Sequence, residues 1–488
     1  MEGRLSKVGG NGRMTTPIVA DYSRRNFLKR TVLAAPVVLG GLSTKAQLAS
    51  ARSDPNSPDA ASPGLASPRN YPGKDTRLSI SMWDFSWLMA HYPGGAYEDL
   101  ERRVAEAAER GYNTLRMDCF PSRILEHEST FPAKNWKPGV NLPMWGEIAM
   151  DYTCNVRKEV AHLADLCRKH GIWLGLDSWD KANMFRATKL PFLETSGAPS
   201  DLFGSVSVTK IPEGDEEPAF MAYGELWVKA LKLMREDGVL ERAVWIAPMN
   251  EVPNFVQGSV ASVIALRRRV TDGQVPKAEA AAELSAAFRR INDYMGAPIK
   301  AEIAKDGIPL SYCSNGDVDY ASRLTDIYDV VDLHFMPQVI EDEEDKRAFL
   351  KAGPGAPNGN FQVLEKFDLK AWSQAWDEAC RRHYPAMLER VSNFFKNALE
   401  HMTLPSGKCL QAIVTECYGS LEWPDSPDVN WEWYKLYNAD ALRIVAGTNL
   451  TGASLSNFGE PLFTLWNDLG WHWTSNNYFR TAPLLARS

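Results

Sequence analysis

Several short apolar runs of the sequence end in a residue that could take part in acid–base chemistry. These end residues are Asp118, Asp177, Glu251, Glu416 and His334. Glu251 closes the run Trp245–Glu251, and Glu416 closes the run Gln411–Glu416. A carboxylate at the tip of an apolar strand is costly unless it is paired or functional. These two glutamates are therefore the leading candidates for catalytic groups.

Two carboxyl groups that face each other can act as an acid and a nucleophile. Cleavage of a glycosidic bond with retention needs one carboxylic acid near the leaving oxygen and one carboxylate beneath the anomeric carbon, about 5–5.5 Å apart. We expect Glu251 to be the acid/base and Glu416 the nucleophile. Their proximity should separate their pKa values, with Glu251 protonated and Glu416 ionised. The alternative is that either glutamate forms a structural ion pair at the root of a loop.

Other polar residues near these ends could support the pair. Asn250 is expected to hydrogen-bond the 2-hydroxyl of a sugar, and Arg116 to hold Glu416 as an anion. Asp84 and Asp177 also end predicted strands, and they could bind sugar hydroxyls or cap a following loop. His334 is equally well explained as a structural histidine that makes its own hydrogen bonds.

Tryptophan is abundant, with sixteen residues in the chain. Sugar rings have apolar C–H faces, so exposed indoles are suitable platforms for them. We expect Trp466, which follows the last predicted strand, to form the wall of a sugar subsite. Trp83 and Trp179 are further candidates, although ordinary packing explains each of them equally well.

Apolar runs alternate with amphipathic helical patterns over most of the chain, as parallel strands joined by helices require. Eight runs predict strands: Leu78–Trp83, Asn113–Asp118, Ile172–Leu176, Val244–Met249, Leu310–Cys313, Val330–Phe335, Ala412–Thr415 and Ala453–Phe458. The repeats predict an α/β fold, a (β/α)8 TIM barrel with long βα-loop insertions. A doubly wound sheet would normally carry a Gly-rich phosphate loop after its first strand, and the sequence has none. The final helix is weakly supported, because only a short tail follows Trp473.

The strand order and local motifs resemble clan A of the retaining glycoside hydrolases, and within it the cellulase-like enzymes related to family 5. The fourth predicted strand ends in Asn250-Glu251, which resembles the clan's acid/base motif, and the seventh ends in Glu416 at the nucleophile position. The segment Gly111–Arg116 resembles the helix-to-second-strand signature, whose arginine lies near the nucleophile. One departure is that the common Asn-Glu-Pro is here Asn250–Pro253, with a valine inserted.

The resemblance implies a β-linked glucan, mannan or related oligosaccharide as substrate, with His334 and Trp466 near the sugar and neither a cofactor nor a metal. A catalytically inactive carbohydrate-binding barrel would keep the aromatic platforms without needing both glutamates. A metal-dependent hydrolase would usually draw on several histidines, and this chain has eight with no His-x-His after the first strand. A serine hydrolase lacks support because there is no Gly-x-Ser-x-Gly elbow.

The N-terminal segment resembles a twin-arginine export signal. It combines Ser23–Lys29, which contains the arginine pair, with the apolar run Thr31–Leu42 and the small residues Ala49–Ala51. We expect residues 1–51 to be the signal, 52–72 a flexible linker and 73–488 one catalytic barrel. The twin-arginine translocation machinery would then export the protein to the periplasm or the extracellular space. The apolar run is too short for stable membrane insertion, and the net charge of −7 does not favour nucleic-acid binding.

Overall fold

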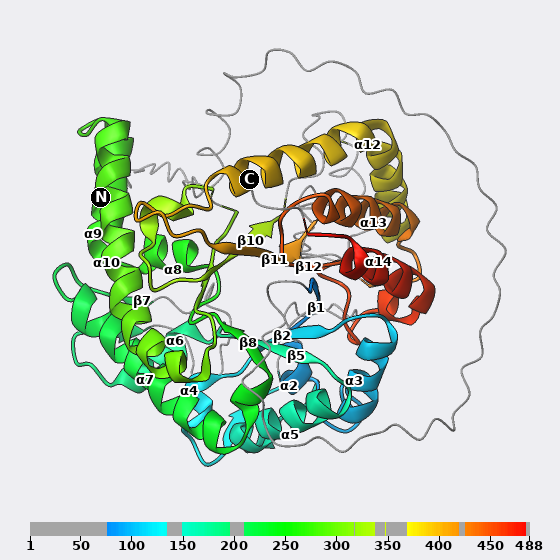
Figure 1. Ribbon diagram of the computed structural model, residues 1–488, viewed down its shortest axis with the longest axis horizontal. Coiled ribbons are helices and arrows are strands. Elements are labelled where there is room, and N and C mark those ends of the chain that lie inside the picture. The colour runs from blue at the N-terminus through cyan, green and yellow to red at the C-terminus, as the bar shows by residue number, and fades with distance from the viewer. Residues whose placement is uncertain are drawn as a thin grey trace, which may run out of the picture. The chain divides into compact units, whose positions relative to one another are not determined.

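Eight parallel strands form the centre of the computed structural model, and helices surround them (Figure 1). The structure describes residues 76–133, 149–195, 209–316, 318–336, 347, 368–418 and 425–484. The predicted export signal and linker lie outside the described residues. In chain order the barrel strands are β1 (Leu78–Asp84), β2 (Thr114–Asp118), β5 (Trp173–Asp177), β8 (Ala243–Ile246), β9 (Ser311–Cys313), β10 (Val330–Phe335), β11 (Gln411–Cys417) and β12 (Gly452–Ser454).

The strands are neighbours in the order β8-β5-β2-β1-β12-β11-β10-β9. An isolated parallel bridge between Ile246 and Leu310 joins the two ends of this order, and the Ile246 amide donates to the Pro309 carbonyl at 3.0 Å. The first strand therefore pairs with the second and the eighth, as in a barrel. The predicted (β/α)8 TIM barrel is confirmed, and all eight predicted strands are present with ends that shift by a few residues.

Amphipathic helices form the outer layer, and polar residues set their ends. Asp99 caps α3 by accepting from the Arg102 amide at 3.0 Å, and Asn155 caps α5 by accepting from the Lys158 amide at 3.0 Å. Gly111 follows α3 with a φ of +82°, a conformation that other residues rarely adopt. The main outer helices are α3 (Leu100–Glu109), α5 (Val156–Lys169), α7 (Glu216–Glu236), α10 (Lys277–Ile303), α12 (Leu369–Glu400), α13 (Glu432–Ala446) and α14 (Leu469–Thr481).

The last helix, α14, is fully formed although its sequence pattern is weak. Polar side chains attach it to the barrel: the buried Asn476 accepts from the Ser79 hydroxyl at 2.8 Å and donates to the Arg110 carbonyl at 2.9 Å. His472 is also buried and contacts the Tyr112 hydroxyl at 2.9 Å. An apolar stripe is therefore replaced by hydrogen-bonding residues, which hydrophobic periodicity does not detect.

The connection after β9 departs from the regular repeat. Between Cys313 and Val330, the described residues contain the short 3-10 helix η3 (Tyr320–Arg323) and no α-helix. The long helix α10 packs against both α7 and η3. Seven of the eight strands are thus followed by an outer α-helix among the described residues, and the fifth strand, β9, is not.

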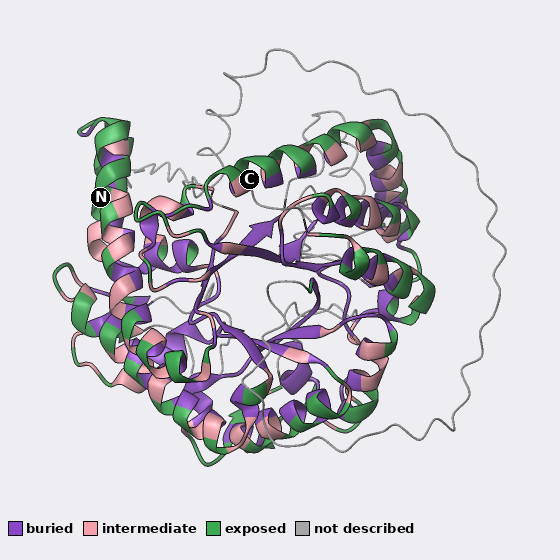
Figure 2. Cartoon of the chain, in the orientation of Figure 1, coloured by how far each residue is buried: buried purple, intermediate pink, exposed green. Residues whose placement is uncertain are grey.

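The strands of the barrel are almost entirely buried (Figure 2), and apolar side chains pack together among them. Trp245 on β8 lies against Gly175 on the neighbouring strand β5, where a Cβ atom would come within 1.9 Å of the indole. Leu78, Ile80 and Ile413 complete the same apolar layer. The barrel is therefore closed by a solid core beneath the carboxyl ends of its strands, where side chains are free to form a site.

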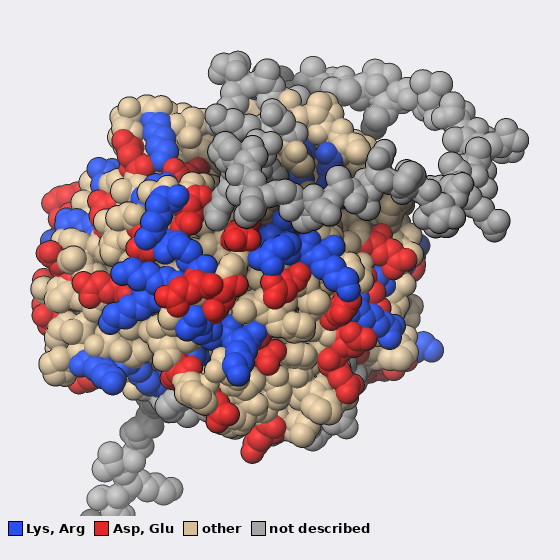
Figure 3. Space-filling view, turned by 60° about the horizontal axis from the view of Figure 1, so that its bottom comes forward, with Lys and Arg blue, Asp and Glu red and all other residues tan. Residues whose placement is uncertain are grey.

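The loops at the carboxyl ends of the strands carry additional short elements. They include α2 (Ser86–Met89), α4 (Pro121–Ile124), α6 (Lys181–Thr188), α8 (Val252–Ser259), α9 (Ala261–Thr271) and two small hairpins, β3–β4 (Ser129–Phe131, Tyr152–Cys154) and β6–β7 (Glu194–Thr195, Thr209–Lys210). Lysine and arginine are interspersed with acidic residues over the face in Figure 3. No described helix has the length and apolar character needed to cross a bilayer.

Candidate active site

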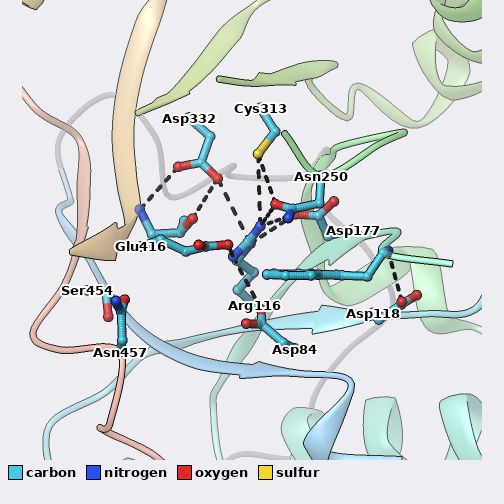
Figure 4. A network of polar contacts seen from close by, with 12 residues as sticks. Asp84, Arg116, Asp118, Asp177, Asn250, Cys313, Asp332, Glu416, Ser454 and Asn457 are labelled. Atoms are coloured by element: carbon cyan, nitrogen blue, oxygen red, sulfur yellow. Dashed lines mark hydrogen bonds and ion pairs between the residues drawn. The ribbon is translucent and has the colours of Figure 1, made fainter. Parts of the chain in front are cut away.

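Charged side chains from six of the eight strands converge at the carboxyl end of the barrel. Figure 4 shows Arg116 at the centre of this cluster, surrounded by Asp84, Asp177, Asn250, Asp332 and Glu416. All of these residues are at most 2% exposed. The barrel topology therefore brings together groups that lie up to 332 positions apart, because each one ends or follows a strand or lies within it.

Arg116 on β2 is the hub of the site. Its Nη1 lies 2.9 Å from Glu416 Oε1 and 3.2 Å from Asp84 Oδ1, while its Nη2 lies 2.7 Å from Asp177 Oδ2 and 2.5 Å from Asn250 Oδ1. Burial opposes the guanidinium charge, but the surrounding carboxylates outweigh this effect and raise the pKa of Arg116 well above its ordinary value. The expected contact between Arg116 and Glu416 is present.

Glu251 has an unusual backbone conformation. It follows β8 and is the N-cap residue of α8, with a φ of +45° in the left-handed region. Such a conformation in a non-glycine residue costs about 1–3 kcal/mol and is found most often at functional sites. Pro253 occupies the first turn of α8, where its missing N–H has no cost. The inserted Val252 thus lets a helix begin directly after the glutamate.

The two glutamate side chains meet at His334 on β10. His334 Nδ1 lies 3.2 Å from Glu251 Oε1 and 3.4 Å from Glu416 Oε2. One oxygen of each glutamate and one nitrogen of His334 all lie within 4.8 Å of one another. Glu251 is 19% exposed and Glu416 only 1%, so the first faces the opening of the site and the second lies deeper.

The pKa values of the pair are separated in the opposite direction to the one expected. Burial raises the pKa of Glu251, but the hydrogen bond and charge of His334, followed by the charge of Lys181, lower it overall. Burial raises the pKa of Glu416, and the charges of His334 and Arg116 offset only part of this. In the ligand-free protein, Glu251 is therefore the more readily ionised of the two.

His334 is held as the proton-bearing partner of the two glutamates. Its Nε2 faces Cys313 Sγ at 3.2 Å, Thr415 Oγ1 at 3.4 Å and Asp332 Oδ2 at 3.7 Å. Burial alone would lower the pKa of His334, but contacts with Cys313, Glu416 and Asp332 raise it well above its ordinary value. The histidine therefore belongs to the site and is charged over a wider pH range than a free histidine.

Cys313, at the end of β9, is a site residue that the sequence analysis left without a role. Its thiol donates to Asn250 Oδ1 at 3.1 Å, and its sulfur accepts from the Glu251 amide at 3.1 Å. Burial raises its pKa to about 12, so it is a neutral thiol. Because Oδ1 of Asn250 accepts from both Arg116 and Cys313, these two contacts leave the Nδ2 group of that amide unused.

Asp332 and Lys181 were absent from the predicted site residues, whereas Asp84, which ends β1, was expected to bind sugar hydroxyls or cap a loop. Asp332 lies within β10, where its carboxylate accepts from the Thr415 hydroxyl at 2.6 Å. A search for strand-end residues finds Asp84 and could have found Cys313, but Asp332 is a mid-strand residue and Lys181 lies in a loop helix. Cys313, Asp332 and His334 also have ligand atoms within 4.8 Å of one another, as a metal site would require, and His334 Nε2 lies close to both of the other groups.

Asp177 contacts Arg116, and its carboxylate is not free to bind a sugar hydroxyl directly. Its Oδ2 binds Arg116, and its Oδ1 accepts from the Ser178 amide at 2.7 Å. Both oxygens are thus engaged in a fully buried side chain. Asp177 therefore orients Arg116 and is not presented to a sugar hydroxyl in this structure.

The three predicted tryptophans have different environments. Trp466 is 2% exposed, stacks on Tyr112 at 6.0 Å and donates from Nε1 to Glu106 at 2.9 Å. Trp466 therefore packs against α3 and Tyr112. The expected role as a subsite wall is wrong, and this side chain belongs to the core. Trp83 is fully buried against Tyr97. Trp179 is partly exposed, and Arg116 Cζ lies 5.2 Å from its ring centroid, so it remains at the site.

Comparison with known proteins supports the fold. A family model with the description "Sugar-binding cellulase-like" matches residues 80–192. This segment includes β2 and β5 but neither Glu251 nor Glu416. A candidate glycoside hydrolase from Parabacteroides distasonis is similar in structure, with 19% identity and a TM-score of 0.58 over 84% of this chain and 96% of that chain. A family 5 mannosidase from Rhizomucor miehei gives 10% identity and a TM-score of 0.41 over 83% and 94%. The curated proteins include no match.

Proposed function

We propose that the protein is a retaining glycoside hydrolase that cleaves β-linked bonds of a poly- or oligosaccharide by double displacement. The observation that carries the proposal is the separation of Glu251 and Glu416, which have carboxylate oxygens within 4.8 Å at the mouth of the barrel. Retaining enzymes place their two carboxyl groups about 5–5.5 Å apart, whereas inverting enzymes leave about 6.5–9.5 Å for a water molecule. The spacing therefore favours direct attack by one carboxylate.

In the first step, Glu416 attacks the anomeric carbon while Glu251 protonates the leaving oxygen, giving a covalent glycosyl-enzyme and a free sugar or alcohol. In the second step, Glu251 removes a proton from water, the water oxygen bonds to the anomeric carbon, and Glu416 leaves as a carboxylate. Arg116 orients Glu416 and disperses its charge when it leaves. The Nδ2 group of Asn250, which the contacts of its Oδ1 leave unused, donates to the 2-hydroxyl of the sugar.

His334 provides the proton that the first step needs. Glu251 is the more readily ionised glutamate without ligand, but His334 Nδ1 lies 3.2 Å from its Oε1. Transfer of one proton along this hydrogen bond gives a neutral imidazole and a protonated Glu251. The proton then passes to the leaving oxygen, and the proton taken from water in the second step restores the resting state.

The cellulase-like family model over residues 80–192 supports a sugar as the substrate, and we propose a β-linked glucan, mannan or related oligosaccharide. A catalytically inactive carbohydrate-binding barrel is the weaker alternative. Binding alone would not require two largely buried carboxylates that share a histidine, and such groups destabilise a protein unless they are used.

We also propose, from the N-terminal sequence, that residues 1–51 direct export. Loss of export when Arg24 and Arg25 are replaced by lysine would test this.

Chemical rescue with azide tests the two assigned roles. Glu416→Ala should abolish turnover of aryl β-glycosides, and azide should not restore a β-configured product. Glu251→Ala should spare substrates with good leaving groups, and azide should enter from the vacated side to give a β-glycosyl azide with net retention. Nuclear magnetic resonance of the product distinguishes the two azide configurations. Full activity of Glu251→Ala on a natural oligosaccharide would contradict the assignment.

A further inference from the structure

Lys181, the first residue of α6, is a buried cation at the edge of the site. It is 9% exposed, and its ammonium group has no hydrogen bond or ion pair with any described residue. Phe185 of α6 stacks on Phe255 of α8, with ring centroids 5.1 Å apart, so the helix that starts at Lys181 packs against the helix that Glu251 caps. The lysine is thus placed beside the proposed acid/base.

The charges that act on Lys181 belong to carboxylates of the proposed active site. In order of strength these are Glu251, Asp177 and Glu416, and all of them favour the charged ammonium. Burial nevertheless outweighs them and lowers the pKa of Lys181. None of the carboxylates lies within 4.0 Å, the distance at which an ion pair forms, so Lys181 sits near the acids without direct contact.

A largely buried ammonium without a close counter-ion destabilises the folded protein, because no carboxylate directly compensates its charge. The cost is greatest during the first catalytic step, when Glu251 must carry a proton and is neutral. A sugar hydroxyl could accept a hydrogen bond from the lysine ammonium, but it would not neutralise the charge. An anionic group on the substrate would do both.

We propose that Lys181 binds a carboxylate on the sugar bound across the two glutamates, so that the substrate is a β-linked oligosaccharide containing uronic acid. This inference rests on the proposed function and specifies its substrate class. The carboxylate of the substrate would become the counter-ion that Lys181 lacks in the free protein. Specificity would then come from one charge in a pocket that contains several acids.

The same contact would help to prepare the site for the reaction. In the free protein the charge of Lys181 contributes to the lowered pKa of Glu251. A substrate carboxylate on Lys181 would cancel that charge, so Glu251 would accept the proton from His334 more readily. Neutral substrates would lack this effect, and they would also leave Lys181 without a counter-ion.

Matched pairs of oligosaccharides provide the test. Oligomers of β-1,4-glucuronan and β-1,4-mannuronan would be compared with their carboxyl-reduced forms, which are β-1,4-glucan and β-1,4-mannan with the same linkages. The wild-type protein should show a higher kcat/KM on at least one acidic oligomer than on its reduced partner. Because removal of one partner of a buried charge pair costs about 2–5 kcal/mol, Lys181→Met should lower this ratio by about 30-fold or more.

Two further variants serve as controls. Lys181→Arg keeps the charge and should keep most of the preference for the acidic oligomer. Lys189→Met removes an exposed lysine at the other end of α6 and should leave the ratio unchanged. An unchanged ratio in Lys181→Met, or a wild-type protein that cleaves only reduced oligomers, would overturn the inference while leaving the proposed hydrolase function intact.

Calorimetric binding gives a readout that does not depend on turnover. In a Glu416→Gln background, an acidic oligomer should bind more tightly than its reduced form, and Lys181→Met should remove the difference. Binding of this kind without turnover in the wild-type protein would support the lysine site and contradict the hydrolase function. Absence of preferential binding to any acidic oligomer would refute the lysine site.

Discussion

The side-chain amide of Asn250 has one orientation that fits its neighbours. Its oxygen accepts from Arg116 Nη2 at 2.5 Å and from the Cys313 thiol at 3.1 Å, so its nitrogen is the end of the amide that these contacts leave unused. In the proposed reaction this nitrogen donates to the 2-hydroxyl of the sugar, a contact that strengthens in the transition state. Cys313 is therefore a positioning residue that acts through Asn250.

Replacement of Cys313 by alanine should reduce kcat/KM on an aryl β-glycoside by about 10²-fold, the effect expected from a small misplacement of a catalytic group. The specific readout is a 2-deoxy substrate. If Cys313 acts through Asn250, the variant should discriminate less between the parent glycoside and its 2-deoxy analogue than the wild-type protein does.

Cys313→Ser should recover part of the activity, because a hydroxyl can also donate to Asn250 Oδ1. Cys167→Ala is the matched control, since Cys167 is an equally buried cysteine on α5 without a contact to the site. Equal losses on the parent and the 2-deoxy substrate in Cys313→Ala would instead indicate a general packing defect.

The residues that sequence reasoning identified share one property: each stands at or next to the end of a predicted strand. Glu251, Glu416, Arg116 and His334 were found in this way, and they meet in the structure as the topology requires. Lys181 lies in a loop helix, so its direction depends on how α6 packs against α8. Trp466 follows a strand as well, yet it turns toward α3, because a position in sequence does not fix the direction of a loop side chain.

Strands were more predictable than helices at the level of elements. The buried strands have continuous apolar runs, and each one was identified within a few residues of its observed ends. Helix α14 was underestimated because only the short tail after Trp473 was considered, whereas the helix begins at Leu469 and is anchored to the barrel by the buried His472 and Asn476. The count of strand–helix repeats also implied an α-helix after the fifth strand, but the described residues there form only η3.

The start of helix α14 is stabilised by a polar cap. Asp468 accepts from the Trp471 amide at 3.0 Å and forms an ion pair with Lys435 at 2.8 Å. Asp468→Ala should lower the free energy of unfolding by about 1 kcal/mol, the usual effect of losing such a cap. Asp468→Asn should lose less, because asparagine also caps helices. Urea unfolding of both variants measures the difference.

The contribution of Asp468 to the free energy of unfolding should depend on pH. Burial raises the pKa of Asp468, but the hydrogen bonds from Lys435 and the Trp471 amide lower it overall. A carboxyl group whose pKa is lowered by folding stabilises the protein above its unfolded pKa and loses this effect as pH falls through the folded value. The difference between the wild-type protein and Asp468→Ala should therefore shrink in acid. A difference that is constant with pH would contradict this role.

Closure of the whole barrel requires its first and last elements to meet. β1 pairs with β12, and the residue before β1, Arg77, is 1% exposed beneath them. Its guanidinium donates to five backbone carbonyls at 2.8–3.1 Å, which belong to Ala446, Thr448, Leu450, Ala482 and Pro483. One side chain thus connects the start of the barrel to the end of α13 and to the segment after α14.

Arg77→Ala should therefore destabilise the whole molecule, not one element. Hydrogen bonds to charged groups contribute about 1.5–3 kcal/mol each, and their removal leaves buried carbonyls unsatisfied, so the free energy of unfolding should fall by at least about 3 kcal/mol. Arg77→Lys should recover only a part, because an ammonium cannot reach carbonyls on both sides as a planar fork does. Arg480→Ala, which removes an exposed arginine of α14 with one hydrogen bond at 3.3 Å, should change stability by about 0.5 kcal/mol or less. If Arg77→Ala matched Arg480→Ala in thermal and urea unfolding, the contacts of Arg77 would not contribute to closure of the barrel.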